Sequence, residues 1–118
     1  MKALTNETLC VGADLGAHLA AGPGGLRAGL RDPAGITAKI EAAGLRGLGG
    51  AGFPTHRKWA AVAAEPGPGK WVICNGNEDE PGTFKDAFLL AQTPHQVIEG
   101  ALIAALATRA ANIALYVN

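Results

Sequence analysis

The chain has 118 residues, with ten basic and ten acidic side chains and therefore no formal net charge at pH 7. This balance gives no electrostatic reason to expect nucleic acid or an anionic membrane as a partner, and the length allows one small core. Two cysteines, Cys10 and Cys74, are too few for a disulfide scaffold and lack zinc-site spacing. With no signal-peptide pattern and no apolar run of roughly twenty residues, the sequence predicts a soluble chain in a reducing compartment.

The first part of the chain predicts little regular structure. Residues 1–31 are rich in glycine and alanine, and we interpret them as a loosely structured lead-in with one short helix. Asp32 and Pro33 then form a typical helix start, with an N-cap aspartate and a proline at the first helical position. Apolar residues recur at helical spacing from Ile36, and Gly44 is expected to end this helix.

A glycine-dense segment follows. Five glycines lie between Gly44 and Gly52, followed by Phe53 and by a second expected helix that starts at Pro54 and carries Lys58. Dense glycines leave backbone N–H groups uncovered, so that a ligand can lie against the main chain. The nearby cations favour a phosphate on that ligand, although an ordinary structural loop is the alternative.

The second half of the chain predicts an α/β fold. Residues 70–75 form a short apolar run that is typical of a buried strand, and residues 112–117 resemble a second strand. Between them, Thr93 and Pro94 repeat the helix-start pattern. Strand, helix and strand make a βαβ unit with a short parallel sheet. Because two strands and one helix are marginal, we expect neighbouring chain, a second copy or a partner subunit to cover the sheet.

Polar side chains follow the first strand directly. Asn75, Asn77, Glu78 and Glu80 come where ligands bind in open α/β sheets, beyond the carboxyl end of a strand. Acids there suit ribose hydroxyls or ring nitrogens. A solvated acidic turn is the alternative. A hard-cation site is a third interpretation, although EF-hand spacing is absent; it would use Glu78, Asp79, Glu80 and Asp86.

The glycines also match the G-x-G-x-x-G dinucleotide fingerprint at Gly47, Gly49 and Gly52. We reject this interpretation, because the fingerprint should follow a strand and open a helix, whereas these glycines follow an expected helix. No acid lies in residues 66–76, where the ribose contact would be expected.

Three motifs in order carry a resemblance to a known family. The motifs are GLRGxGGAGFPT with a Lys-Trp, then CNxxExEPGTFKD, then PHxxIEG. In this order they resemble the flavin-carrying, NADH-binding subunit of respiratory complex I and of related NAD-linked hydrogenases and formate dehydrogenases. The likeness covers residues 30–118. It implies flavin mononucleotide (FMN) and NAD as cofactors, with hydride transfer from NADH to the flavin and single electrons passing to iron–sulfur clusters elsewhere. No side chain is then needed as a catalytic acid or base.

The resemblance also implies a set of cofactor-binding residues. Phe53 would pack against NADH, and Lys58 would lie near the flavin phosphate. Asn75 would hydrogen-bond the flavin, and Glu80 would lie beside the nicotinamide. The full set comprises Gly47, Gly49, Gly50, Gly52, Phe53, Lys58, Asn75, Asn77, Glu78 and Glu80.

The two tryptophans, Trp59 and Trp71, allow two interpretations. Each can pack in the core or shield a bound flavin, and we expect core packing. Cys74, inside the apolar strand, is likewise expected to be a small core residue.

The chain departs from the family pattern at several positions. Leu48 replaces an arginine, His56 a glycine, Asn77 an aspartate and Ala87 an arginine. Losing a charge-assisted hydrogen bond typically weakens an interaction by roughly 1.5–3 kcal/mol. Leu48 and Asn77 are therefore expected to reduce cofactor affinity.

The resemblance predicts an incomplete domain over residues 32–118. The family's second glycine-and-acid motif and its four-cysteine helical bundle are expected after Asn118, so that any iron–sulfur cluster, which needs about four thiolates, lies outside this chain. The expected partners are other subunits of an electron-transfer complex, in the cytoplasm and peripheral to the inner membrane. The isolated chain is expected to be inactive. The alternative function is a truncated, non-catalytic assembly or interaction module.

Overall fold

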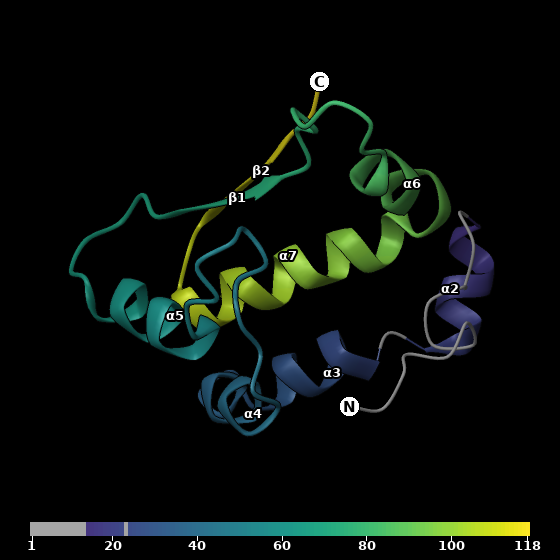
Figure 1. Cartoon of the computed structure of the whole chain (residues 1–118). Coiled ribbons are helices and arrows are strands. Elements are labelled where there is room, and N and C mark those ends of the chain that lie inside the picture. Colours follow the sequence, from purple (N-terminus) through teal and green to yellow (C-terminus); the bar gives the residue numbers. More distant parts are fainter. Residues whose placement is uncertain (1–13, 23) are drawn as a thin grey trace.

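The structure, a computed structural model, describes residues 14–22 and 24–118 (Figure 1). Cys10 and the first part of the expected lead-in lie outside these residues. The described elements, in chain order, are α2 (Leu15–Ala21), α3 (Gly24–Arg31), α4 (Ile36–Ala42), α5 (Thr55–Ala64), β1 (Trp71–Asn75), α6 (Lys85–Gln92), α7 (Pro94–Thr108) and β2 (Asn112–Tyr116).

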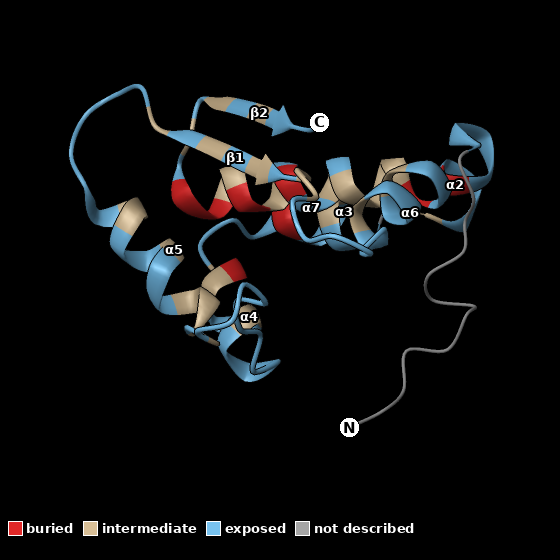
Figure 2. Cartoon of the chain, turned by 45° about the horizontal axis from the view of Figure 1, so that its top comes forward, coloured by how far each residue is buried: buried red, intermediate tan, exposed pale blue. Residues whose placement is uncertain are grey.

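Helix α7 runs through the middle of the molecule, with the two strands on one side and α3, α4 and α5 on the other (Figure 1). It also contacts α6. Its buried apolar residues, Ala101, Ala104 and Ala107, recur every three residues and so lie along one face of the helix. Together with Ile36 of α4 they form the buried apolar core of the described residues (Figure 2). The core is small because its central side chains are methyl groups.

The two strands pair in parallel, which confirms the predicted α/β fold and the predicted pairing. The register runs from Trp71 opposite Asn112 to Asn75 opposite Tyr116. The predicted strands each extend one residue beyond the observed ones. The connection between the strands holds α7, as expected, and also α6, which the sequence did not predict.

The lead-in, expected to hold one short helix, forms two helices within its described part, α2 and α3. Both are tied to α7 by Glu99. The buried His18 of α2 places Nε2 3.4 Å from Glu99 Oε2. The other carboxylate oxygen of Glu99 accepts a hydrogen bond of 2.8 Å from the Leu26 N–H in the first turn of α3. The glutamate of the PHxxIEG motif therefore holds three helices together.

The helix expected from Asp32 begins later, at Ile36. Asp32 still caps the preceding turn, because its carboxylate accepts a hydrogen bond of 2.9 Å from the Gly35 N–H. Gly44 lies just beyond the end of α4 with a φ of 64°, as the sequence predicted for a terminating glycine. Helix α5 begins directly after Pro54.

One side of the sheet is open. Trp71, Ile73 and Tyr116 are 58%, 65% and 57% exposed, respectively. The expectation that Trp71 packs in a core is therefore wrong, since α7 covers the opposite face, where Val72 and Cys74 are half-buried. None of the described helices has the length and apolar content needed to cross a membrane.

Candidate functional site

Residues 47–53, here called the glycine loop, form a closed excursion between α4 and α5. Arg46 and Pro54 make an antiparallel bridge at its base, and the Gly47 N–H donates a 2.9 Å hydrogen bond to the Phe53 carbonyl. The Arg46 guanidinium donates a 3.0 Å bond to the carbonyl of Gly52. Sequence reasoning missed this role of Arg46, although a lone cation at the base of a glycine-dense stretch was a usable signal.

The tip of the glycine loop presents bare backbone. Gly50 has a φ of 107° and Gly52 a φ of 59°. A Cβ atom added to Gly49 or Gly50 would meet no heavy atom within 4 Å. Gly50 and Gly52 are therefore required for their backbone conformation rather than for lack of space, and the main chain at the tip of the loop is accessible to a ligand.

The first pocket, here called the lysine pocket, lies between the glycine loop, α5, α7 and β1. It has a volume of about 500 Å³, within the usual range for ligand sites. Its lining residues are Gly47, Phe53, Thr55, Lys58, Trp59, Val62, Trp71, Val72, Ile73, Ala104 and Thr108.

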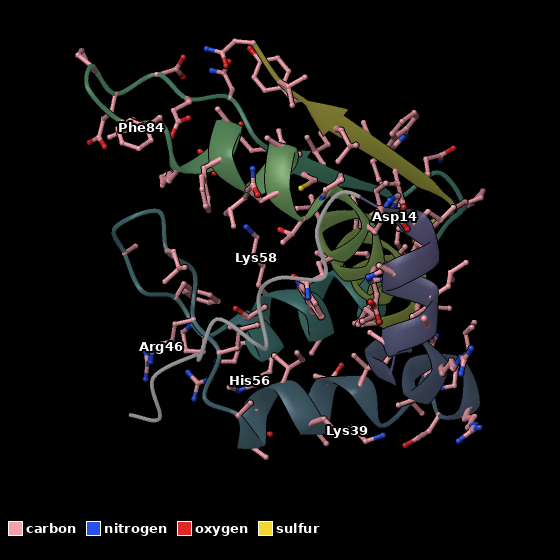
Figure 3. The ribbon with its side chains drawn as sticks, turned by 90° about the vertical axis from the view of Figure 1, so that its right-hand side faces the viewer. Asp14, Lys39, Arg46, His56, Lys58 and Phe84 are labelled. Atoms are coloured by element: carbon pink, nitrogen blue, oxygen red, sulfur yellow. The ribbon has the colours of Figure 1, made fainter. Side chains whose placement is uncertain are left out.

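Lys58 is the charged side chain of this mostly apolar and aromatic pocket. It is exposed and forms no ion pair with any residue that the structure describes. In Figure 3 it projects from α5 toward the side where α6 lies, while Arg46 points away from it. An unpaired ammonium beside apolar walls is suited to an anionic group on a flat ligand.

The acidic loop, residues 76–83, is ordered by two local turns. The Asn75 side-chain oxygen accepts a 3.1 Å hydrogen bond from the Asn77 N–H, which bends the chain as it leaves β1. The Glu80 carbonyl accepts bonds from the Thr83 N–H at 3.1 Å and from the Thr83 hydroxyl at 2.7 Å. Asn75, predicted to contact the flavin, here shapes the loop.

The carboxylate of Glu78 points to the start of α6. One of its oxygens accepts a 3.0 Å hydrogen bond from the Asp86 N–H, and the other accepts a 3.1 Å bond from the Ala87 N–H. Both oxygens of this predicted cofactor ligand are therefore engaged with the protein.

The second pocket, here called the acidic pocket, joins the tips of the two loops and has a volume of about 460 Å³. Its one cation, Lys85, forms an ion pair with Asp86. The hydrogen bond to Asp86 is the main cause that raises the pKa of Lys85. Carboxylates therefore dominate the pocket. It is lined by Leu48, Gly49, Gly50, Asn77, Glu78, Asp79, Glu80, Thr83 and Lys85.

The predicted site residues thus fall into two neighbouring pockets that share the glycine loop. The acidic pocket brings together five of them, namely Gly49, Gly50, Asn77, Glu78 and Glu80. The lysine pocket holds three others, namely Gly47, Phe53 and Lys58. The remaining two, Gly52 and Asn75, line neither pocket. Contact between these residues and a cofactor stays a prediction.

Two further features bear on the sequence interpretation. His56, which replaces a family glycine, is half-buried and places Nε2 3.4 Å from Glu41 Oε1, joining α5 to α4. In the described part of the chain, no group of three or more His, Cys, Asp or Glu side chains is arranged to hold a metal ion. The cation site considered from the sequence therefore gains no support.

Comparison with known proteins places these pockets in a family context. The family model of the Nuo51 FMN-binding domain matches residues 40–118. The chain is 43% identical over 83 residues to an NADH-quinone oxidoreductase subunit of Rhizobium meliloti, and the match covers 70% of this chain and 20% of that protein. It is 44% identical over 79 residues to the corresponding protein of Aquifex aeolicus, and this match covers 67% of this chain and 18% of that protein. The corresponding protein of Escherichia coli is 43% identical over 76 residues, and the match covers 64% of this chain and 17% of that protein.

The matched part of this chain spans about a fifth of the length of these relatives. The family match takes in the glycine loop, the acidic loop, both strands and the helices between them. It excludes α2, α3 and the first turn of α4. The chain belongs to the Nuo51 FMN-binding domain family.

Proposed function

We propose that this chain supplies part of an FMN- and NADH-binding site in an NADH:acceptor oxidoreductase. The observation that carries the proposal is the acidic pocket, in which the glycine loop and the acidic loop, far apart in sequence, meet. Both loops lie inside the segment that matches an FMN-binding domain.

The residues of the lysine pocket fit an FMN molecule. The unpaired ammonium of Lys58 would bind the phosphate. Phe53 and Trp71 offer half-exposed aromatic surface against which a flat ring system can pack. Bound FMN would supply the redox chemistry, accepting a hydride from NADH and releasing single electrons. The protein's part is to bind, orient and shield the reacting rings.

The acidic pocket suits a different part of the ligands. Its carboxylates would repel a phosphate but accept hydrogen bonds from ribose hydroxyls. The side chains of Asp79 and Glu80 make no hydrogen bond to the described residues, so their carboxylates are free to accept hydrogen bonds from a ligand. We infer that NADH lies with its ribose on this side.

The proposal extends to partners. The relatives are named as subunits of NADH-quinone oxidoreductases, and a chain with two cysteines cannot hold an iron–sulfur cluster by itself. We infer that electrons leave to clusters held elsewhere, in a complex with other subunits that is cytoplasmic and peripheral to the inner membrane. The domain of residues 32–118 would be one wall of the complete site.

A non-catalytic assembly module is the second candidate. Leu48, at the tip of the glycine loop, is 98% exposed and lines the acidic pocket where the family has a cation. An exposed leucine there offers no charge and no hydrogen bond to a ligand, and it would suit contact with another protein.

Titration of the purified chain with FMN, followed by flavin fluorescence, separates the two candidates. We expect weak binding, because both pockets are open to solvent. Lys58→Ala should weaken it about tenfold or more, the cost of a lost charge-assisted hydrogen bond. Arg57→Ala is the matched control, since Arg57 is the neighbouring exposed cation on α5 and lines neither pocket.

The two candidates give different results. Equal loss in Lys58→Ala and Arg57→Ala would reject the assignment of Lys58. No fluorescence change in the wild-type chain at millimolar flavin would favour the assembly module.

A further inference from the structure

The acidic loop is anchored to the rest of the molecule through Glu78. The side chain of Asn118, beyond β2, brackets the backbone of Glu78. Its oxygen accepts from the Glu78 N–H and its amide nitrogen donates to the Glu78 carbonyl, each at 3.3 Å. The carboxylate of Glu78 reaches the other way, to the N–H groups of Asp86 and Ala87. One residue therefore links the end of β2, the acidic loop and α6.

Helix α6 needs this link. The first N–H groups of a helix have no partner within the helix, and the residue before it normally supplies a side-chain acceptor. Here that residue is Phe84, which makes no such bond. The Glu78 carboxylate takes its place from the preceding loop, and its negative charge is favoured at the positive end of the helix.

We propose that Glu78 is a positioning residue that fixes the acidic loop to α6 and does not itself contact a cofactor. Its neighbours Asn77 and Glu80 then line the acidic pocket facing the glycine loop, with Gly49 and Gly50 on the other wall. The inference rests on the proposed function for the identity of the ligand, but the anchoring contacts can be tested without any ligand.

Amide hydrogen exchange of the purified chain, measured by NMR, tests the anchor first. Glu78→Gln keeps the shape of the side chain but turns one acceptor oxygen into a donor that faces an N–H group. Exchange at Asp86 and Ala87 should become about tenfold faster, because a charged hydrogen bond is lost. The amide of Asn77 should accelerate with them, since the loop is released. Glu65→Gln, an exposed acid that lines neither pocket, should change nothing.

A second variant keeps the proposal testable if the Glu78→Gln chain does not fold. Asn118→Ala leaves the carboxylate of Glu78 in place and should accelerate exchange of the Glu78 amide. Unchanged exchange at Asp86 and Ala87 in Glu78→Gln overturns the proposal. Acceleration at those two positions without any at Asn77 also overturns it, because Glu78 would then cap the helix without holding the loop.

The affinity of the chain for NADH, measured well below the melting temperature, is a second property that the loss of a helix cap alone would leave unchanged. A folded chain that has lost only helix stability should bind NADH as the wild type does, whereas a displaced acidic loop should weaken NADH binding by about tenfold. Unchanged NADH affinity in Glu78→Gln would overturn the positioning role. If the wild-type chain binds no NADH, the proposed function fails for this chain, and the exchange of Asn77 still decides whether Glu78 positions the loop.

Discussion

In the described part of the chain, carboxylates hold the beginnings of three helices and the turn before a fourth, and they do so in two ways. Asp14 accepts from the Ala17 N–H and Asp32 from the Gly35 N–H, each three residues along the chain. These are local contacts of the kind that sequence reasoning can predict. It predicted Asp32 as the N-cap of a helix, whereas the carboxylate caps the turn before α4. Glu78 and Glu99 cap α6 and α3 from elsewhere in the fold. No spacing rule finds such caps, because the acceptor is brought there by tertiary packing.

The cap at Asp32 has a consequence for the pH dependence of stability. Its hydrogen bond with the Lys39 ammonium, then the bond from the Gly35 N–H, lowers the pKa of Asp32 below the usual value of about 3.9. A lowered folded-state pKa stabilises the fold above the unfolded-state value, and this contribution disappears as the pH falls through the folded-state value.

We therefore expect Asp32→Asn to lower the melting temperature slightly at neutral pH, with the difference from wild type disappearing in acid as the pH falls through the folded-state pKa of Asp32. The effect should shrink in high salt, since both partners are exposed. Thermal unfolding followed by circular dichroism across this pH range is the measurement. A difference that persists in acid would mean that the shape of the side chain, rather than its charge, matters.

At the level of elements, sequence reasoning worked where the signal is local. The strand ending at Asn75, the helix starting at Pro94 and the termination at Gly44 each follow from periodicity or a terminating residue, and the structure has all three. It failed at α6, since Phe84 is no cap and the acceptor that starts the helix is eight residues away. The cofactors were predicted from sequence motifs. The arrangement of the site residues in two pockets could not be predicted in this way, because it depends on how the glycine loop and the acidic loop pack against each other.

The glycine loop gives a prediction at this scale. Gly52, with a φ of 59°, lies in the left-handed region that asparagine tolerates, whereas Gly50, at 107°, lies outside it. Gly52→Asn should therefore cost less than about 1 kcal/mol of unfolding free energy, and Gly50→Asn about 1–3 kcal/mol. Urea denaturation of the two variants compares the same side chain at two backbone conformations. Equal costs would show that the loop relaxes around either substitution.

For the whole molecule, the open side of the sheet is the dominant feature. Parallel sheets are normally covered on both faces, yet Trp71, Ile73 and Tyr116 remain more than half exposed. The zero net charge of the chain adds no repulsion between copies. The sequence already suggested that further polypeptide must cover this sheet, and the exposed aromatic and aliphatic surface supports that expectation.

We expect the isolated chain to self-associate through this face as its concentration rises. Ile73→Lys should reduce association while changing the unfolding free energy by no more than about 0.5 kcal/mol, as for other exposed positions. Val72→Lys is the matched control, because Val72 points to the opposite, half-buried face. Burying a lysine there should destabilise the fold by about 2 kcal/mol or more. Sedimentation velocity over a concentration series, with urea denaturation of each variant, measures both effects. The prediction is wrong if the chain stays monomeric at high concentration. It is also wrong if the Ile73→Lys variant associates as readily as the wild type, because association would then not depend on the open face.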